Sequence, residues 1–148
     1  MKRYIRNAIS DINDEHWQAK EEIAKDLSTP VEVLRHMATY PDSCVKCEIA
    51  KNPNAPLDLL EQLSEDGDEV VRWGVTQNPN TSVDLLAQLA EDVNWEVVEG
   101  VTENPNTPDG VLLRIKERLD NWAERLGINY YPSRYERKAR SNIMERLH

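Results

Sequence analysis

The sequence has no phenylalanine, five glycines and two cysteines among its 148 residues. So few glycines argue against a β-sandwich, in which turn residues such as glycine separate many short strands. Two cysteines are too few for the disulfide framework of a small secreted protein. No apolar run approaches the ~18 residues of a membrane-spanning helix, and no apolar segment of a signal peptide follows the basic start Met1–Tyr4. The sequence therefore predicts a soluble, cytoplasmic protein with no membrane partner.

Basic residues are scarce in most of the chain. The 18 Lys and Arg residues stand against 27 Asp and Glu residues, which gives a net charge of −9. Residues 1–110 hold 9 of the basic and 22 of the acidic residues, whereas residues 111–148 hold 9 and 5. An acidic body with a basic end forms an electrostatic dipole, and its field affects which partners the chain attracts.

A repeat of 26 residues runs through the body of the chain. The tripeptide Asn-Pro-Asn occurs at 52–54, 78–80 and 104–106. The same spacing relates three sets of apolar residues, which are Val45, Ile49, Leu59, Leu60 and Leu63; Val71, Val75, Leu85, Leu86 and Leu89; and Val97, Val101, Val111, Leu112 and Ile115. One period earlier the positions hold Ile23, Val33, Leu34 and Met37, and Asp26-Leu27-Ser28 replaces the tripeptide. A fixed period of this length is typical of repeat proteins.

Each unit is predicted to form two helices. Val71 and Val75 share one face of a first helix of about two turns, and the proline after Asn78 keeps that residue out of helical geometry. The second helix carries Leu-Leu-x-x-Leu on one face. It is predicted to begin at a Thr-Pro or similar pair, with Thr as the N-cap where it is present. These pairs are Thr29-Pro30, Ala55-Pro56, Thr81-Ser82 and Thr107-Pro108.

An ordinary leucine-rich repeat has a similar period, but it needs strands with alternating Leu-x-Leu. In this chain the leucines are adjacent and then three or four residues apart, which is a helical spacing. No unit contains a run of alternating β-branched residues. The sequence therefore predicts an all-α repeat solenoid, in which stacked units bury the apolar faces that single units would expose.

Residues 71–92 read Val-x-x-x-Val-x-x-Asn-Pro-Asn-Thr-x-x-x-Leu-Leu-x-x-Leu-Ala-x-Asp. This pattern resembles the leucine-rich repeat variant (LRV) family, and the resemblance extends over residues 12–119. It implies a right-handed superhelix in which short 3₁₀-like helices alternate with longer α-helices. One prototype of the family has a cysteine-rich iron–sulfur segment before its repeats. No segment of this chain matches it, and no cofactor is expected.

The whole chain, residues 1–148, is predicted to be one domain with helical caps. Residues 1–15 form an N-terminal capping helix, residues 16–117 the repeats, and residues 118–148 C-terminal capping helices with a basic face. The N-terminal helix would cover the first unit with an apolar stripe of Ile5, Ala8, Ile9 and Ile12. The first C-terminal helix would be one long helix that ends at Gly127 and carries the apolar residues Val111, Leu112, Ile115, Leu119, Trp122, Ala123 and Leu126. The last helix would begin with a capping box at Ser133 and Glu136 and carry the stripe Tyr135, Ala139, Ile143 and Leu147.

Two cysteines form a Cys-x-x-Cys motif, Cys44 and Cys47. A redox pair of this kind usually begins a helix next to a βαβ unit, which this chain lacks, and zinc would need two further ligands at suitable spacing. The equivalent residues one repeat later are Val70 and Trp73. The sequence therefore favours part-buried packing residues over a metal or redox site.

Catalysis is not predicted. The three histidines are isolated in the sequence, there is no glycine-rich phosphate loop, and the carboxylates fall on helix ends and exposed faces. The sequence favours a protein that is not an enzyme and has no catalytic or metal-binding residues.

Candidate partner-binding residues lie where the repeats differ. Trp73 is equivalent to Cys47 and Glu99, so a large aromatic side chain stands at a variable position; it would be either a binding anchor or a local packing residue. Nearby carboxylates complete an acidic candidate set of Glu69, Glu96, Glu99 and Glu103. A second candidate set is basic and consists of Arg134, Arg137, Lys138 and Arg140.

The basic set allows two interpretations, a nucleic-acid contact or an end cap whose charge complements the acidic body, and the sequence favours the cap. The leading functional hypothesis is a non-enzymatic protein-interaction module that engages a basic protein partner. The alternative is a nucleic-acid-linked role, either through the basic C-terminal helix or through acidic mimicry of DNA towards a DNA-binding protein.

Overall fold

Two helices follow one another in each 26-residue unit of the computed structural model, which describes residues 17–127 and 132–147. The described residues form nine α-helices and no strand, so the all-α prediction is confirmed. The helices are α2 (Trp17–Lys25), α3 (Val31–Met37), α4 (Ser43–Lys51), α5 (Leu57–Ser64), α6 (Glu69–Thr76), α7 (Val83–Leu89), α8 (Trp95–Glu103), α9 (Asp109–Leu126) and α10 (Arg134–Leu147). Across these residues, no helix combines the length and the apolar character needed to cross a membrane.

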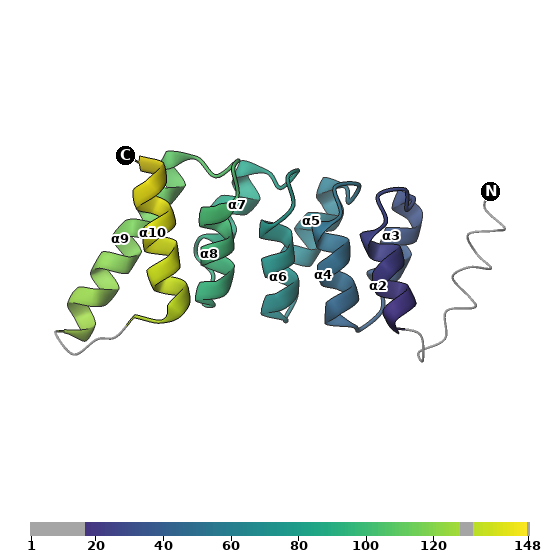
Figure 1. The fold of residues 1–148 in the computed structure, drawn as a ribbon, viewed down its shortest axis with the longest axis horizontal. Coiled ribbons are helices and arrows are strands. Elements are labelled where there is room, and N and C mark those ends of the chain that lie inside the picture. Colours follow the sequence, from purple (N-terminus) through teal and green to yellow (C-terminus); the bar gives the residue numbers. More distant parts are fainter. Residues whose placement is uncertain (1–16, 128–131, 148) are drawn as a thin grey trace.

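The helices lie in two rows along the long axis of the molecule (Figure 1). We call α2, α4, α6 and α8 the first-helix row and α3, α5, α7 and α9 the second-helix row. Neighbours in the first-helix row pack directly on one another, and α10 packs against both α8 and α9. The last helix therefore continues the first-helix row beyond the third Asn-Pro-Asn unit.

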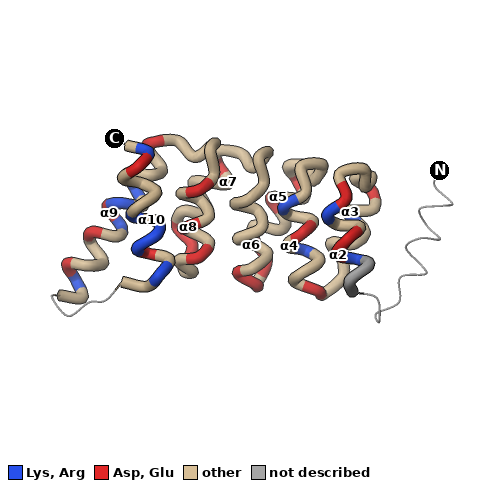
Figure 2. The backbone as a smooth tube through the Cα atoms, in the orientation of Figure 1, with Lys and Arg blue, Asp and Glu red and all other residues tan. Residues whose placement is uncertain are grey.

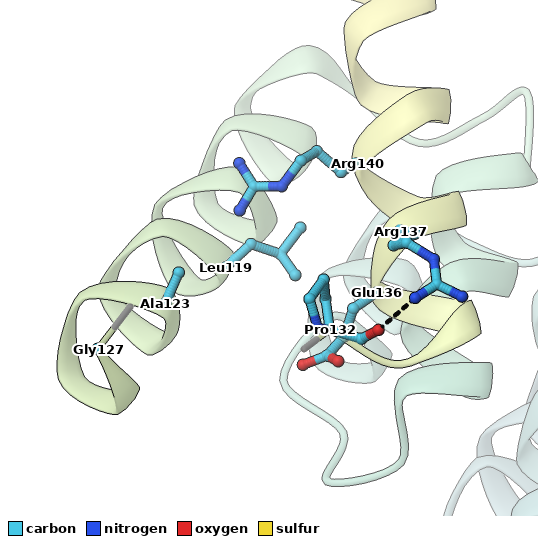
Figure 3. A pocket seen from close by; sticks show the side chains of 7 residues that line it. All are labelled: Leu119, Ala123, Gly127, Pro132, Glu136, Arg137 and Arg140. Carbon is cyan, nitrogen blue, oxygen red and sulfur yellow. Dashed lines mark hydrogen bonds between the residues drawn. The ribbon is translucent and has the colours of Figure 1, made fainter. Parts of the chain in front are cut away.

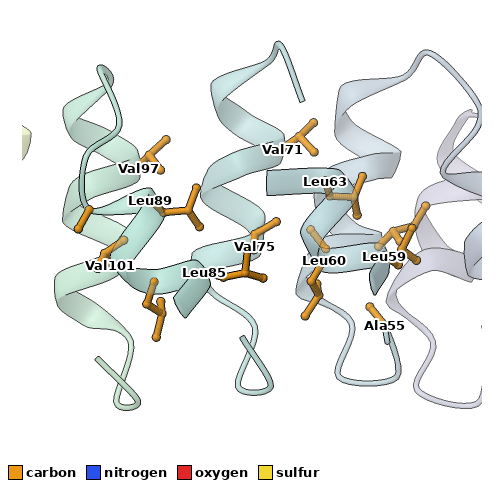
Figure 4. Packing of buried hydrophobic residues seen from close by; sticks show 14 of the residues in the cluster. Ala55, Leu59, Leu60, Leu63, Val71, Val75, Leu85, Leu89, Val97 and Val101 are labelled. Atoms are coloured by element: carbon orange, nitrogen blue, oxygen red, sulfur yellow. The ribbon is translucent and has the colours of Figure 1, made fainter. Parts of the chain in front are cut away.

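The apolar side chains of both rows meet between them (Figure 4). Val71 and Val75 of α6 are fully buried, as is Leu86 of α7, and Leu85 and Leu89 are almost so. Their equivalents in the neighbouring units belong to the same continuous core. Burial of one such side chain contributes about 1.5–3 kcal/mol, which explains why the apolar positions recur in every unit.

The predicted alternation of short 3₁₀-like and longer α-helices is wrong for the described residues. Both helices of each unit are α-helices, of nine and eight residues in α4 and α5 and of eight and seven in α6 and α7. The reason lies in the spacing of Val71 and Val75, because residues four apart share a face of an α-helix, whereas a 3₁₀-helix aligns residues three apart. The long exception is α9, with 18 residues.

The helix starts differ from the predicted Thr caps. The N-caps of α4, α6 and α8 are Asp42, Asp68 and Asn94, and each of their side chains accepts a hydrogen bond from a backbone N–H of the first turn. The second helix α7 is capped by Ser82, while Pro30, Pro56 and Pro108 precede the others without a side-chain cap. Thr81 instead donates its hydroxyl to the Val75 carbonyl at 2.6 Å. The hydroxyls of Thr29 and Thr107 make the same contact, with the carbonyls of Ile23 and Val101.

At the C-terminal end, α9 stops at Gly127, whose φ of 78° lies in the left-handed region that favours glycine. The predicted capping box is confirmed, since Ser133 N–H donates to the Glu136 carboxylate and Glu136 N–H to the Ser133 hydroxyl. The long helix is present as predicted, but its apolar stripe is buried only as far as Leu119. Trp122 and Leu126, which follow, are about half exposed. The predicted N-terminal stripe from Ile5 to Ile12 lies outside the described residues.

Candidate functional site

Asparagine side chains join each unit to the one before it. The Asn78 amide is buried between units and donates from Nδ2 to the carbonyls of Ala50 at 2.6 Å and Asn52 at 2.8 Å. Asn52 and Asn104 make the same pair of contacts one unit earlier and one unit later. The first asparagine of each Asn-Pro-Asn motif therefore donates to backbone carbonyls at the C-terminal end of the first helix in the preceding unit. The motif is a structural feature rather than a binding site.

The last helix ends this asparagine ladder with an arginine. Arg146 stands three residues after the buried Ile143, as Asn104 stands three after Val101. Its guanidinium donates to the carbonyls of Asn104 at 2.9 Å and Thr107 at 2.7 Å, and to that of Thr102 at 3.3 Å. The contacts of Arg146 support the interpretation of α10 as an end cap.

A second set of polar contacts links the units by charge. Lys46 pairs with Asp66 at 2.8 Å, and one repeat later Arg72 pairs with Asp92 at 2.7 Å. Burial acts to raise the pKa of Asp92, but hydrogen bonds from Arg72 and from the backbone N–H of Asn94 outweigh it and hold the pKa below its usual value. Such structural ion pairs shift carboxylate pKa values without any catalytic role.

Part of the acidic candidate set lies against the basic C-terminal helix, as the red segments of α8 beside the blue segments of α10 show (Figure 2). Burial and the neighbouring Glu103 raise the pKa of Glu99, although Lys138 and Arg134 act in the opposite direction. The charge of Glu96 and its hydrogen bond raise the pKa of Tyr135. The structure thus brings Glu96 and Glu99 together with α10, whereas Glu69 is exposed at the start of α6.

Trp73 is half-buried and packs against the hydrophobic core. The Lys51 ammonium lies 5.6 Å from the centre of its ring. On the other side, a Cβ atom added to Gly100 would lie 3.1 Å from Cδ1 of the indole, so the helix α8 approaches the ring closely. These contacts occupy much of the indole surface, which favours the packing alternative for Trp73.

The basic candidates of α10 differ in how far they are engaged. Arg140 pairs with Asp120 at 2.6 Å, and Arg137 donates to the Pro132 carbonyl at 2.7 Å. A cleft of about 220 Å³ lies between α9 and α10 and has Arg137, Arg140, Leu119 and Pro132 in its lining (Figure 3). All four side chains are exposed, and the Arg134 guanidinium lies 6.0 Å from the centre of the Tyr135 ring. Two of the four predicted basic residues therefore make polar contacts within the C-terminal segment that the structure describes.

The two cysteines have different environments. Cys47 is buried, as predicted, and burial raises the pKa of its thiol to about 11, so it is protonated at neutral pH. The prediction of burial is wrong for Cys44, which is exposed because its position falls on the outer face of α4. Within the described ranges, no three His, Cys, Asp or Glu residues are grouped so as to hold a metal ion.

The asparagine ladder and the capping aspartates were not recognised from the sequence, although both recur every 26 residues. The 26-residue period could have revealed both. A polar residue that recurs at a buried position, such as Asn78, or just before a helix, such as Asp68, indicates a hydrogen bond to the backbone. No family model, curated protein or solved structure matches this chain. Its function is therefore inferred from the contacts and charges of the chain itself.

Proposed function

We propose that this chain is a non-catalytic binding protein, and that its acidic surface engages a basic protein partner. One observation carries the proposal. Residues 17–110 contain nineteen carboxylates and six cations, and each of the six cations already has an internal partner. The contacts join Lys25 to Glu21, Arg35 to Asp58, Lys46 to Asp66, Lys51 to Glu48 and Arg72 to Asp92, and they place Lys20 over the Tyr40 ring.

The surplus carboxylates are therefore available to cations from outside the chain. A surface of one charge sign attracts a partner of the opposite sign and repels others, which gives both faster association and selectivity. Glu61, Glu65, Glu69 and Asp84 are exposed members of this surplus, and all four belong to the central units. The central part of the acidic body is thus the best place for a basic partner.

The proposal also includes the way in which the repeat units stack. The 26-residue unit and the repeated asparagine contacts support an LRV-type solenoid wound as a right-handed superhelix, with residues 1–15 and 118–148 as its caps. Repeat proteins of this kind present long surfaces built from equivalent positions of successive units, and they commonly bind other proteins through them. The two free thiols, Cys44 and Cys47, suit a reducing compartment such as the cytoplasm.

A role linked to nucleic acid is the second candidate, and the exposure of Arg134 and Lys138 favours it. Its weakness is that Arg140 and Arg146 of the same helix are held by internal contacts. Direct binding of DNA would also bring phosphates close to a strongly acidic body.

Fluorescence anisotropy separates these candidates. The probes are a labelled 14-residue peptide with arginine and leucine on opposite helix faces, the same peptide with glutamine in place of arginine, and a labelled 20-base-pair DNA duplex. The proposal predicts that the arginine peptide binds, that its affinity falls as salt rises, and that the glutamine peptide and the duplex do not bind. Failure of the arginine peptide at low salt, or tighter binding of the duplex, would contradict it.

A further inference from the structure

Neighbouring helices of the second-helix row are bridged by different side-chain contacts at equivalent positions. The second-helix row has three such boundaries within the described residues, between α3 and α5, α5 and α7, and α7 and α9 (Figure 1). Because the units repeat every 26 residues, each position at one boundary has an equivalent at the next. The side chains at these equivalent positions can therefore be compared directly.

An arginine bridges the first boundary. Arg35 of α3 donates from both terminal nitrogens to the carboxylate of Asp58 in α5, at 2.7 and 2.8 Å. This two-point contact matches the planar guanidinium to the two carboxylate oxygens.

An arginine also bridges the third boundary. Arg114 of α9 donates to the Ala87 carbonyl of α7 at 3.2 Å and contacts the Glu91 carboxylate at 3.3 Å. Both ends of the row therefore supply their own cation to the acidic side chains between the helices.

The middle boundary, between α5 and α7, has no cation at either of the two equivalent positions. Glu61 stands at the position of Arg35, and Gln88 at the position of Arg114, one repeat away in each case. The acceptors remain, since Asp84 is equivalent to Asp58 and Glu65 to Glu91. Glu61, Glu65 and Asp84 have no ion-pair partner among the described residues.

A groove opens at this middle boundary. It has a volume of about 390 Å³, and Glu61, Glu65, Asp84 and Gln88 line it together with Leu57 and Leu85. Leu57 is 46% exposed, whereas Leu85 is only 5% exposed and belongs to the core. The groove thus combines carboxylates that have no cation partner with one exposed leucine side chain.

We propose that this groove, which we call the α5–α7 groove, binds a basic segment of a protein partner. An arginine of that segment takes the place that Arg35 occupies at the first boundary, and its guanidinium bridges Glu61 and Asp84. An apolar side chain next to that arginine packs on Leu57. This inference rests on the proposed function, and it names the surface and the side chain that a partner must supply.

The chemistry of the groove selects among possible ligands. Three carboxylates repel the phosphates of a nucleic acid, and the exposed leucine favours a ligand that carries apolar groups beside its charge. Arginine fits better than lysine because the contact at the first boundary uses the forked geometry of the guanidinium, whereas the lysine ammonium is a point charge.

The Glu61→Arg substitution tests the groove because it rebuilds the internal pair of the first boundary. The new arginine would bridge to Asp84 as Arg35 bridges to Asp58, so the protein should melt at the wild-type temperature or slightly above. Binding of the 14-residue arginine peptide should weaken about tenfold, since an attraction of the size typical for exposed ion pairs becomes a repulsion. A second substitution, Asp84→Asn, should weaken it about threefold on the same scale.

The matched control is Glu22→Arg, which makes the same charge change at an exposed residue of α2. It should alter peptide affinity less than twofold, because it lies on the other row and acts only through screened charge. The lysine version of the peptide should bind wild-type protein more weakly than the arginine version.

Each outcome supports or overturns either the α5–α7 groove or the proposed function. Equal losses from Glu61→Arg and Glu22→Arg would overturn the groove and leave the proposed function standing, because net charge alone would then explain binding. Unchanged peptide affinity in Asp84→Asn would overturn the groove as well. This second variant still tests the proposal if Glu61→Arg does not fold. If wild-type protein binds no arginine peptide, or binds the DNA duplex in preference, the proposed function itself fails.

Discussion

The two rows of helices carry the same number of repeats but use them differently. In the first-helix row, successive helices touch, and buried amides, hydroxyls and glycines recur at equivalent positions. Gly74 shows how close the contact is, since a Cβ atom there would lie 2.9 Å from the Cys47 carbonyl oxygen. In the second-helix row, leucines recur on the inner face, while the outer positions change from Arg35 to Glu61 to Ala87.

This difference separates stability from binding. A position that donates to a buried carbonyl, such as Asn78, cannot change without leaving that carbonyl unpaired. An outer position, such as Glu61, contributes little to the fold, because exposed ion pairs are worth about 0–1 kcal/mol. We therefore expect substitutions in the first-helix row and the core to change stability, and substitutions on the outside of the second-helix row to change binding.

The largest effect is expected in the core that both rows share. Leu86→Ala removes a fully buried side chain of α7, and it should lower the free energy of unfolding by about 2–5 kcal/mol. Chemical denaturation monitored by circular dichroism measures this loss. Leu113→Ala, at a residue that is 49% exposed, is the control. A loss in Leu86→Ala no greater than in this control would show that the leucine does not lie in the core.

The asparagine ladder should show the next largest effect. Asn78→Ala leaves the carbonyls of Ala50 and Asn52 without their donor, and it should lower the free energy of unfolding by about 2–4 kcal/mol. Asn80→Ala is a matched control, because its amide also donates to a carbonyl of the preceding unit, that of Pro53 at 2.6 Å, but is exposed. Equal losses in the two variants would contradict the role assigned to the buried amide.

The link between Arg72 and Asp92 should appear as a dependence of stability on pH. Although burial opposes it, hydrogen bonding lowers the pKa of Asp92 from its usual 3.8 in the folded state. The ionised form therefore stabilises the fold above pH 3.8, and this contribution is lost as pH falls through the lowered value. Asp92→Asn should cost about 1–3 kcal/mol at pH 7.

Denaturation of both proteins from pH 7 to pH 2.5 checks this sign. The stability difference between wild type and Asp92→Asn should shrink steadily below pH 3.8. A constant difference over the whole range would mean that the carboxylate charge contributes nothing.

The smallest effect is expected at Glu99, where α8 meets α10. Burial and Glu103 raise the pKa of this carboxyl, so its ionised form is disfavoured in the folded state. Stability should increase as pH falls through the raised value, and Glu99→Gln should stabilise the protein at pH 7 by up to about 0.5 kcal/mol. Differential scanning calorimetry can resolve such a change. A lower melting temperature for Glu99→Gln would show that Lys138 and Arg134 dominate this contact instead.

Much of the fold was predictable because apolar spacing reports burial directly. Val71, Val75 and the leucines of α7 lie in the core as their period indicated. The threonine caps were misassigned because a hydroxyl can contact either the following helix or the preceding one, and Thr81 contacts the carbonyl of Val75. Trp122 looked like a core residue because its helix is amphipathic, but the stack ends before the helix does.

The candidate site was less predictable because charge in a sequence does not reveal its partners. Glu96 and Glu99 were grouped with Glu69 by sign, yet the structure brings the first two against α10. Glu61 was not singled out, although its equivalent Arg35 differs in sign. The missing cation at Glu61 becomes evident only when equivalent outer positions are compared between units. That comparison requires the structure, because the sequence does not show that Arg35 contacts Asp58.

The central claim, that the first-helix row sustains the fold while the outside of the second-helix row binds the partner, is tested most directly by two variants measured together. Melting temperature and affinity for the arginine peptide are determined for Asn78→Ala and Glu61→Arg, with affinity measured below both melting temperatures. The account predicts that Asn78→Ala melts several degrees lower with affinity near wild type, and that Glu61→Arg melts like wild type with affinity about tenfold weaker. A lower melting temperature with unchanged affinity in Glu61→Arg would contradict it.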